Sequence, residues 1–210
     1  SSVPDTTSKI NFTADKSAFD KNGIQWVINP LDEFALTKAI KLQESQGATV
    51  TVLNVGDAGT EAVIRKALAI GANDAVRVNA EAKDSFSVAK EIAKVAQDGG
   101  YDLILTGKES IDYNGGAVPG MVAQLLNIPF VNASVGLDVN GSEATVVREI
   151  EGGKETISVK LPAVVAGQKG LVDEKDLIIP NMRGIMSART KPLQVVEPSN
   201  SEVKVAAVCF

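Results

Sequence analysis

The chain of 210 residues contains no histidine and a single cysteine, Cys209. Without histidine there is no imidazole general base, no histidine zinc ligand, and no Ser–His or Cys–His catalytic pair. One cysteine excludes an internal disulfide and a cysteine-based metal site, and it suits a reducing compartment. Acid–base chemistry would have to use carboxylates or lysines. The composition therefore favours binding, or chemistry supplied by a cofactor, with no catalytic residue and no metal site expected.

Long apolar runs and net positive charge are missing as well. No apolar stretch is long enough to cross a bilayer, so no membrane insertion is expected. The net charge of -5 and the pI near 4.9 argue against a nucleic-acid-binding surface. The length suffices for one α/β domain, alone or with an appendage.

Strand and helix patterns alternate as far as residue 128. The helix at 29–46 begins with Asn29 as a candidate cap and Pro30 in its first turn, and the helix at 85–98 should turn Phe86, Val88 and Ile92 inward. This alternation predicts a parallel sheet flanked by helices, a Rossmann-like arrangement with ligands at the carboxyl ends of the strands. The expected strands are Thr49–Val55, Asp74–Val78 and Leu103–Leu105, the last buried on both faces of the sheet.

From Phe130 onward the pattern becomes antiparallel. Three short strands, at 137–139, 145–150 and 156–161, are joined by hairpin turns at 140–141 and 152–153, and a further buried strand follows at 163–166. The stretch from Gly170 to Lys191 shows no clear periodicity. A loop of this length in a compact domain is usually functional, and its clustered apolar residues argue against disorder. The end, Val203 to Phe210, is apolar and strand-like.

The segment between Tyr101 and Pro129 carries the clearest binding signal. A strand runs into Gly107, a polar glycine-bearing turn follows at 110–116, and a helix begins near Val118 with Pro119 in its first turn. Strand, glycine-rich loop and helix N-terminus together offer free backbone N–H groups to a phosphate. An ordinary turn between a strand and a helix would show the same pattern.

Four segments resemble the beta-subunit family of electron transfer flavoproteins. They are NPLDEFALTKAIKL at 29–42, VIRKALAIGAND at 63–74, GKESIDYNGG with GMVAQLLNIP between 107 and 129, and VREIEGGKETISVKLPAVV at 147–165. They occur in the family's order and cover nearly the whole chain. The family's hydrophobic first strand does not appear before the SSVPD at residues 1–5.

The resemblance implies an adenine-nucleotide site where loops 29–32, 54–56 and 107–118 converge. The ligand would be a structural AMP, or a second FAD as in electron-bifurcating members; an empty cleft is the alternative. Many relatives carry polar residues where Gly116 and Ala117 stand, so only backbone contacts would remain there. Asp112 and Glu109 are more simply turn residues, because bare carboxylates repel phosphate. The matching positions are Asn29, Pro30, Leu31, Asp32, Val55, Gly107, Asp112, Gly115, Gly116, Ala117 and Val118.

The resemblance also implies a protruding recognition loop at 170–192 that docks onto partner dehydrogenases. Met182 stands at the family's apolar anchor position, and Ile185 and Met186 match closely. Arg183 and Arg189, with Lys191, would form a basic rim. Methionine and isoleucine suit a surface that accepts several partners. The alternative is a loop folded onto its own core.

The function implied is that of an electron carrier subunit rather than an enzyme. It would pair with an alpha subunit, share FAD with it, and take electrons from acyl-CoA and other flavin dehydrogenases, as in fatty acid oxidation. A bacterial cytoplasm or a mitochondrial matrix would house it. Residues 1–169 would form the nucleotide-binding domain and 193–210 the start of a C-terminal arm. The alternative is a stress-type or adenylating α/β protein, although no G-x-x-x-x-G-K-[ST] loop occurs.

Overall fold

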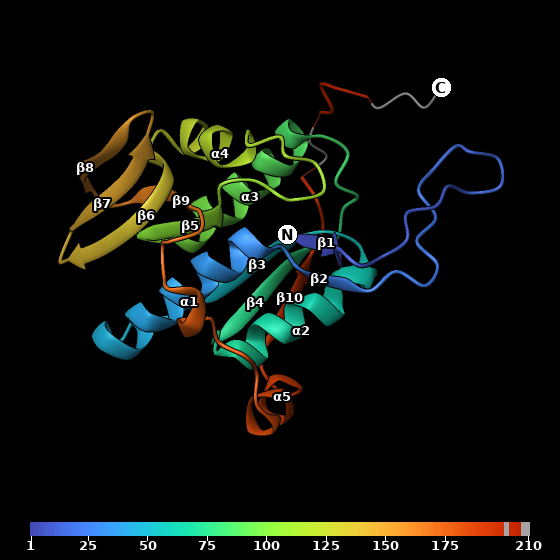
Figure 1. Cartoon of the computed structure of the whole chain (residues 1–210), viewed down its shortest axis with the longest axis horizontal. Helices are drawn as coiled ribbons and strands as arrows, with labels where there is room; N and C mark the ends of the chain where they lie inside the picture. The colour runs from blue at the N-terminus through green and yellow to red at the C-terminus, as the bar shows by residue number, and fades with distance from the viewer. Residues whose placement is uncertain (200–201, 207–210) are drawn as a thin grey trace.

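The computed structural model describes residues 1–199 and 202–206 (Figure 1). The predicted alternation of strands and helices is present in its first part. The helices are α1 (Pro30–Gln46), α2 (Glu61–Ile70), α3 (Ser85–Gly99) and α4 (Val118–Leu126), and the strands between them are β3 (Thr51–Val55), β4 (Asp74–Val78) and β5 (Leu103–Gly107).

These strands belong to two sheets. β4 pairs in parallel with β3 on one side and with β10 (Leu193–Val196), a strand not predicted, on the other. β5 instead pairs in parallel with β9 (Ala163–Gly167) at the edge of a five-stranded sheet of order β5-β9-β6-β7-β8. The expectation that β5 is buried on both faces of a sheet is therefore wrong: it is an edge strand, and residues 103–106 are half-buried.

The antiparallel part follows as predicted. β6 (Phe130–Asn140), β7 (Glu143–Ile150) and β8 (Gly153–Lys160) form two hairpins. Gly141 and Gly152 occupy the turns with φ of 60° and 82°, a conformation that glycine adopts without steric cost. β6 also runs parallel to β9, which joins the hairpins to the parallel strands.

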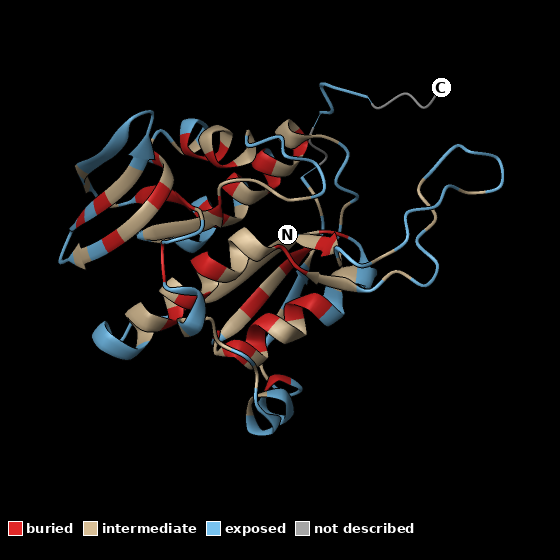
Figure 2. Cartoon of the chain, in the orientation of Figure 1, coloured by how far each residue is buried: buried red, intermediate tan, exposed pale blue. Residues whose placement is uncertain are grey.

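Among the described residues, three apolar clusters form the core, and α1 contributes to two of them. Ile40 packs with α2 and the three-stranded sheet, whereas Phe34 packs with residues of β6, β7 and β9. The third cluster lies between α3, α4 and β9. Buried residues in Figure 2 follow α2 and the sheets, while much of the hairpins and most of α5 are exposed. Helix α1 thus holds the two sheets together.

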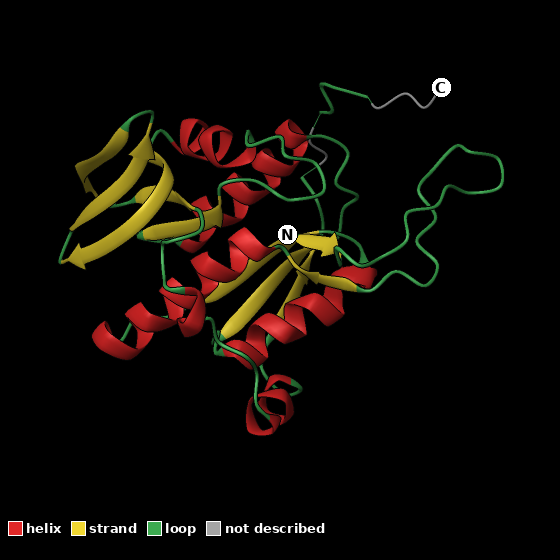
Figure 3. Cartoon of the chain, in the orientation of Figure 1, coloured by secondary structure: helices red, strands yellow, loops and turns green. Residues whose placement is uncertain are grey.

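The N-terminal region forms an arm. β1 (Ser2–Pro4) pairs antiparallel with β2 (Trp26–Ile28). Residues 5–25 between them project from the body as a loop (Figure 3), with a single bridge joining Phe12 and Phe19. The loop contains a turn at Asn22-Gly23, with Gly23 at φ 73°.

We predicted a loop without regular structure from Gly170 to Lys191, and this prediction is wrong. This stretch contains a 3-10 turn at Glu174–Asp176 and helix α5 (Met182–Ala188). Residues 203–206 form no strand, so the strand expected at the end is absent from its described half; residues 207–210, Cys209 among them, lie outside the described part.

Candidate functional site

The first turn of α1 and the end of β5 are joined by three hydrogen bonds. The Gly107 N–H donates to Asp32 Oδ1 at 2.6 Å. Asn29 Nδ2 donates to the Glu109 carbonyl at 2.9 Å, and the Ile111 N–H donates to Asn29 Oδ1 at 3.0 Å. Two of the three predicted loops, 29–32 and 107–118, are therefore brought together.

Gly107 is required for this close approach. A Cβ placed on it would lie 2.9 Å from Asp32 N and from Leu31 C, which are backbone atoms that cannot swing aside. Asn29 is 1% exposed, and its amide is engaged by the loop and by Asp32. Its side chain makes no capping hydrogen bond to α1, so the prediction that it caps this helix is wrong. The Asn29 amide and the Gly107 N–H hold the two elements in place.

Asp32 carries its negative charge at this junction. Its carboxylate accepts hydrogen bonds from the Gly107 N–H and from the Asn29 amide, and both favour the charged form. A charged carboxylate disfavours a neighbouring phosphate. A nucleotide phosphate is therefore better placed at the far end of the loop.

That far end is open. Gly115 and Gly116 are exposed, and Gly116 has a φ of 59°, as a left-handed residue. Helix α4 starts at Val118 with Pro119 in its first turn, and the cap residue Ala117 makes no side-chain hydrogen bond. No side chain among the described residues thus caps the first N–H groups of α4. Free N–H groups and the helix dipole favour an anion here.

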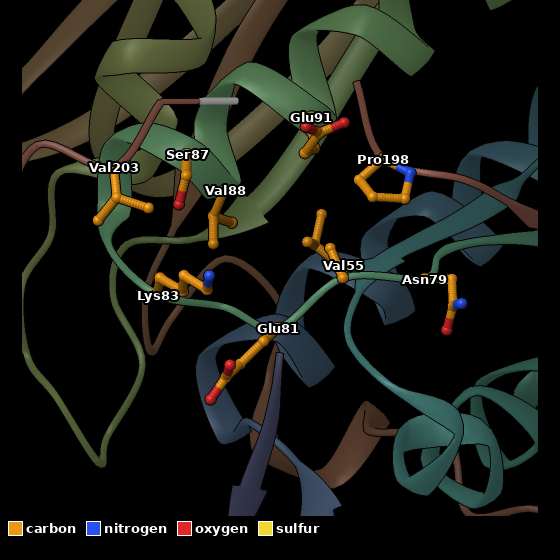
Figure 4. Close-up of a pocket in the computed structure, with 10 residues that line it drawn as sticks. Val55, Asn79, Glu81, Lys83, Ser87, Val88, Glu91, Pro198 and Val203 are labelled. Carbon is orange, nitrogen blue, oxygen red and sulfur yellow. The ribbon is translucent and has the colours of Figure 1, made fainter. Parts of the chain in front are cut away.

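The third predicted loop, at Val55, opens on a pocket of about 330 Å³ at the ends of β3 and β4 (Figure 4). Val55 is the one predicted nucleotide-site residue among its lining residues. Lys83 extends its amine into the pocket, while Glu81 points away. The other lining residues are Asn79, Ala80, Ser87, Val88, Glu91, Pro198 and Val203.

Two contacts show that this pocket lies next to the loop at 107–118, which we call the glycine loop. Arg77 Nη1 donates to the Gly56 carbonyl and to Asn79 Oδ1, both at 2.9 Å, which ties the ends of β3 and β4 together. A Cβ on Gly115 would lie 3.9 Å from Ser85 Oγ, so the glycine loop adjoins the start of α3. The sequence analysis did not place Asn79 and Lys83 at this pocket. The available signal was the capping pair Asp84 and Ser87, which marks the start of a helix directly after Lys83.

The predicted docking residues lie on and beside α5. Met182 is 72% exposed and Ile179 87%, and Ile185, Met186, Arg183 and Arg189 are exposed as well. We expected Lys191 in the basic rim, but the structure places it elsewhere. Its Nζ donates to the carbonyls of Leu68 and Ala72 at 3.0 and 2.6 Å, and burial lowers the pKa of Lys191.

Two classes of site find no support among the described residues. No group of three or more acidic, histidine or cysteine side chains there is arranged to hold a metal ion. No described helix is both long and apolar enough to traverse a bilayer.

Comparison with known proteins identifies the family. The model of the electron transfer flavoprotein domain matches residues 17–201. The beta subunit of the Bacillus subtilis electron transfer flavoprotein is 38% identical over 197 residues, which cover 92% of this chain and 75% of that protein. The Syntrophomonas wolfei beta subunit is 35% identical over 208 residues, covering 98% and 81%, and the Homo sapiens beta subunit is 32% identical over 211 residues, covering 98% and 82%. The chain belongs to the beta-subunit family of electron transfer flavoproteins, a family of electron carriers, as the resemblance in its sequence indicated.

Proposed function

We propose that this chain is the beta subunit of a heterodimeric electron transfer flavoprotein. It pairs with an alpha subunit, accepts electrons from acyl-CoA and other flavin dehydrogenases, and passes them on; the FAD held with the alpha subunit supplies the electron transfer. The chain is a carrier subunit rather than an enzyme by itself. The observation that carries the proposal is the exposed apolar surface of α5 on a chain of this family.

This surface has the composition of a docking site. We call Ile179, Met182, Ile185 and Met186 the docking patch; its members are between 42% and 87% exposed. Large apolar side chains that enter a desolvated pocket dominate binding energy, and flexible methionines fit pockets of different shape. Arg183 and Arg189 lie at its rim, where charge mainly steers association. Ala188 at the end of α5 is buried against the core, whereas Met182 is exposed, which supports a docking role for Met182 in particular.

The bound nucleotide in this proposal is a structural AMP. Its phosphate lies at Gly115–Val118, where the first N–H groups of α4 lack a side-chain cap, and away from the charged Asp32. Its adenosine lies toward Val55. Asn29, Asp32 and Gly107 hold the start of the loop against α1, with Pro30 and Leu31 in the first turn of that helix, and Asp112 lies in the exposed turn. The AMP performs no chemistry; it fastens the loops to one another. A second FAD in the same place is the alternative for a bifurcating protein.

The docking role is tested by Met182→Ala in the flavin-loaded heterodimer. Truncating a central anchor costs about 2 kcal/mol or more, so electron transfer from a dehydrogenase should fall at least about tenfold. Flavin content, melting temperature and reduction by a small chemical donor should stay normal, because the side chain is exposed. Ser187→Ala on the same helix is the control. A Met182→Ala heterodimer that is stable, flavin-loaded and fully active with dehydrogenases would refute the docking role.

A further inference from the structure

Helix α5 lies unusually close to α2, and the point of contact is a glycine. A Cβ placed on Gly184 would lie 2.5 Å from the carbonyl oxygen of Ala69 and 3.5 Å from its carbonyl carbon. Real side chains do not approach backbone atoms this closely, and a carbonyl at the end of a helix cannot swing aside. The position of α5 therefore depends on the absence of a side chain at residue 184.

The two helices also cap each other. Arg65 of α2 donates through Nη1 to the carbonyls of Ala188 and Lys191, at 2.9 and 2.8 Å, and so satisfies the end of α5. Lys191, just beyond α5, donates to the carbonyls of Leu68 and Ala72 at the end of α2. Positive side chains at helix C-termini pair with unsatisfied carbonyls and with the dipole. The end of α5 is thus bonded by Arg65 of α2, and the end of α2 by Lys191 from the segment that follows α5.

The start of α5 is fixed as well. The Gly184 N–H donates to Asn181 Oδ1 at 2.8 Å, which caps the helix. Ala188 at its other end is 2% exposed and packs in the core cluster that contains α2. A seven-residue helix is too short to be stable alone, so these contacts, and not its own propensity, hold α5 in place.

We infer that Gly184, Arg65 and Lys191 are positioning residues that hold α5 rigidly on α2, so that Met182, Ile185 and Met186 are presented before a dehydrogenase arrives. The inference rests on the proposed docking function and deepens it. A surface that is ordered in advance loses less conformational entropy on binding. None of the three positioning residues needs to touch the partner.

Gly184→Ala is the sharpest variant because two effects have opposite signs. Helix propensity alone predicts that alanine strengthens α5, whereas the clash with Ala69 predicts that α5 is displaced from α2. In the heterodimer we expect the dehydrogenase concentration for half-maximal electron transfer to rise at least about threefold, with the maximal rate and the flavin content retained. We expect trypsin to cleave after Arg183 and Arg189 several times faster. Ser187→Ala, which alters an exposed residue of α5, should change neither.

A second pair of variants covers the case in which Gly184→Ala does not fold. Arg65→Gln removes the cation at the end of α5 and should change trypsin cleavage and half-saturation in the same direction, whereas Arg65→Lys should restore part of both. Normal trypsin resistance and normal half-saturation in Arg65→Gln and in any folded Gly184→Ala would overturn the inference. If Met182→Ala leaves electron transfer intact, the docking function fails instead, and the trypsin result still decides whether α5 is held by these residues.

Discussion

Two glycines near the proposed nucleotide site are needed for different physical reasons. Gly107 allows α1 and β5 to approach, because any Cβ would meet backbone atoms of Leu31 and Asp32 at 2.9 Å. Gly116 has room around it, with its nearest neighbours 3.9 Å from a built Cβ, but its φ of 59° suits glycine. Replacing the first should disturb packing, whereas replacing the second should strain the backbone.

Gly107→Ala should destabilise the protein by about 1–3 kcal/mol, the usual cost of overpacking. For a chain of this size, each kcal/mol lowers the melting temperature by roughly 2–4 °C. Gly153→Ala is the matched control, because its Cβ would meet nothing within 4 Å. Thermal unfolding of both variants measures the difference. Equal melting temperatures would show that α1 and β5 are not held as closely as described.

Gly116→Val should release the nucleotide. A β-branched residue at positive φ costs about 1–3 kcal/mol, and its side chain would crowd a phosphate on this loop. Gly116→Asn separates the two effects, since asparagine tolerates positive φ but still adds a side chain. We expect the nucleotide content of the heterodimer to fall in both variants and stability to fall more in the valine variant. Full occupancy in both would place the phosphate elsewhere.

At the scale of elements, α3 anchors the segment that follows β10. Asp84 caps α3 by accepting from the Ser87 N–H at 2.7 Å, and it also accepts from the N–H groups of Lys204 and Val205 at 2.6 and 2.9 Å. Hydrogen bonds from the Ser87 side chain and N–H, with smaller contributions from 204 and 205, hold the pKa of Asp84 well below its usual 3.8. Glu91, about two turns further along α3, accepts from the Ser199 N–H at 2.9 Å.

Asp84 should therefore contribute to stability in a pH-dependent way. A carboxyl whose pKa is lowered by folding stabilises the protein above its unfolded pKa, and this contribution is lost as pH falls from about 4 through the lower folded pKa. Asp84→Asn should lower the melting temperature at pH 7 and make its decline below pH 4 shallower than in the unaltered protein. Glu151→Gln, in an exposed hairpin turn, is the control. Parallel melting curves from pH 7 down to pH 2.5 would contradict the role of Asp84.

Local patterns predicted the elements well because their signals are local. The alternation, the hairpin turns and the ends of α1 follow from periodicity and from glycine at turns. Three features depended on distant contacts and were missed. Asn29 looks like a helix cap but bonds to residues 109 and 111. In α3, Ile92 packs against an apolar cluster as expected, but Phe86 and Val88 are only half-buried, and Ala89 and Ala93 are buried as well. Helix α5 is too short for its periodicity to show.

The candidate sites were predicted by resemblance, and the structure sorts their residues by position. Asn29, Asp32 and Gly107 meet in one hydrogen-bonded junction, whereas Val55 lines a separate pocket beside it. No pattern in the sequence indicates that β5 leaves the sheet of β3 and β4, because strand pairing is a long-range choice. Long-range contacts also determine the pairing of β10 with β4 and the hydrogen bonds of Lys191 to the end of α2, so neither could be predicted from local sequence.

On the scale of the whole molecule, the proposed sites lie far apart. Figure 1 shows α5 at the bottom of the view and the loop that precedes α4 near the top. Helix α1 joins the two sheets between them through Ile40 and Phe34. A dehydrogenase on α5 would therefore leave the nucleotide loop uncovered, and variants at the two sites should act independently.

Combining Met182→Ala with Gly116→Val tests this independence. We expect the loss of dehydrogenase-driven electron transfer to follow Met182 and the loss of nucleotide to follow Gly116, with free-energy changes that add within about 0.5 kcal/mol, as for distant sites. Electron transfer and nucleotide content measured on both single variants and the double variant give the comparison. A double variant that departs strongly from the sum would show that the two sites are coupled.

The most direct test of the central claim is to co-express the chain with an electron transfer flavoprotein alpha subunit and analyse what the complex holds. Acid release followed by mass and absorbance measurements should find one FAD and one AMP per heterodimer, and a dehydrogenase with its substrate should reduce the flavin. Two FAD molecules and no AMP would replace the structural nucleotide with a second flavin. A chain that remains a monomer, binds no alpha subunit, and forms or cleaves adenylates by itself would contradict the carrier role.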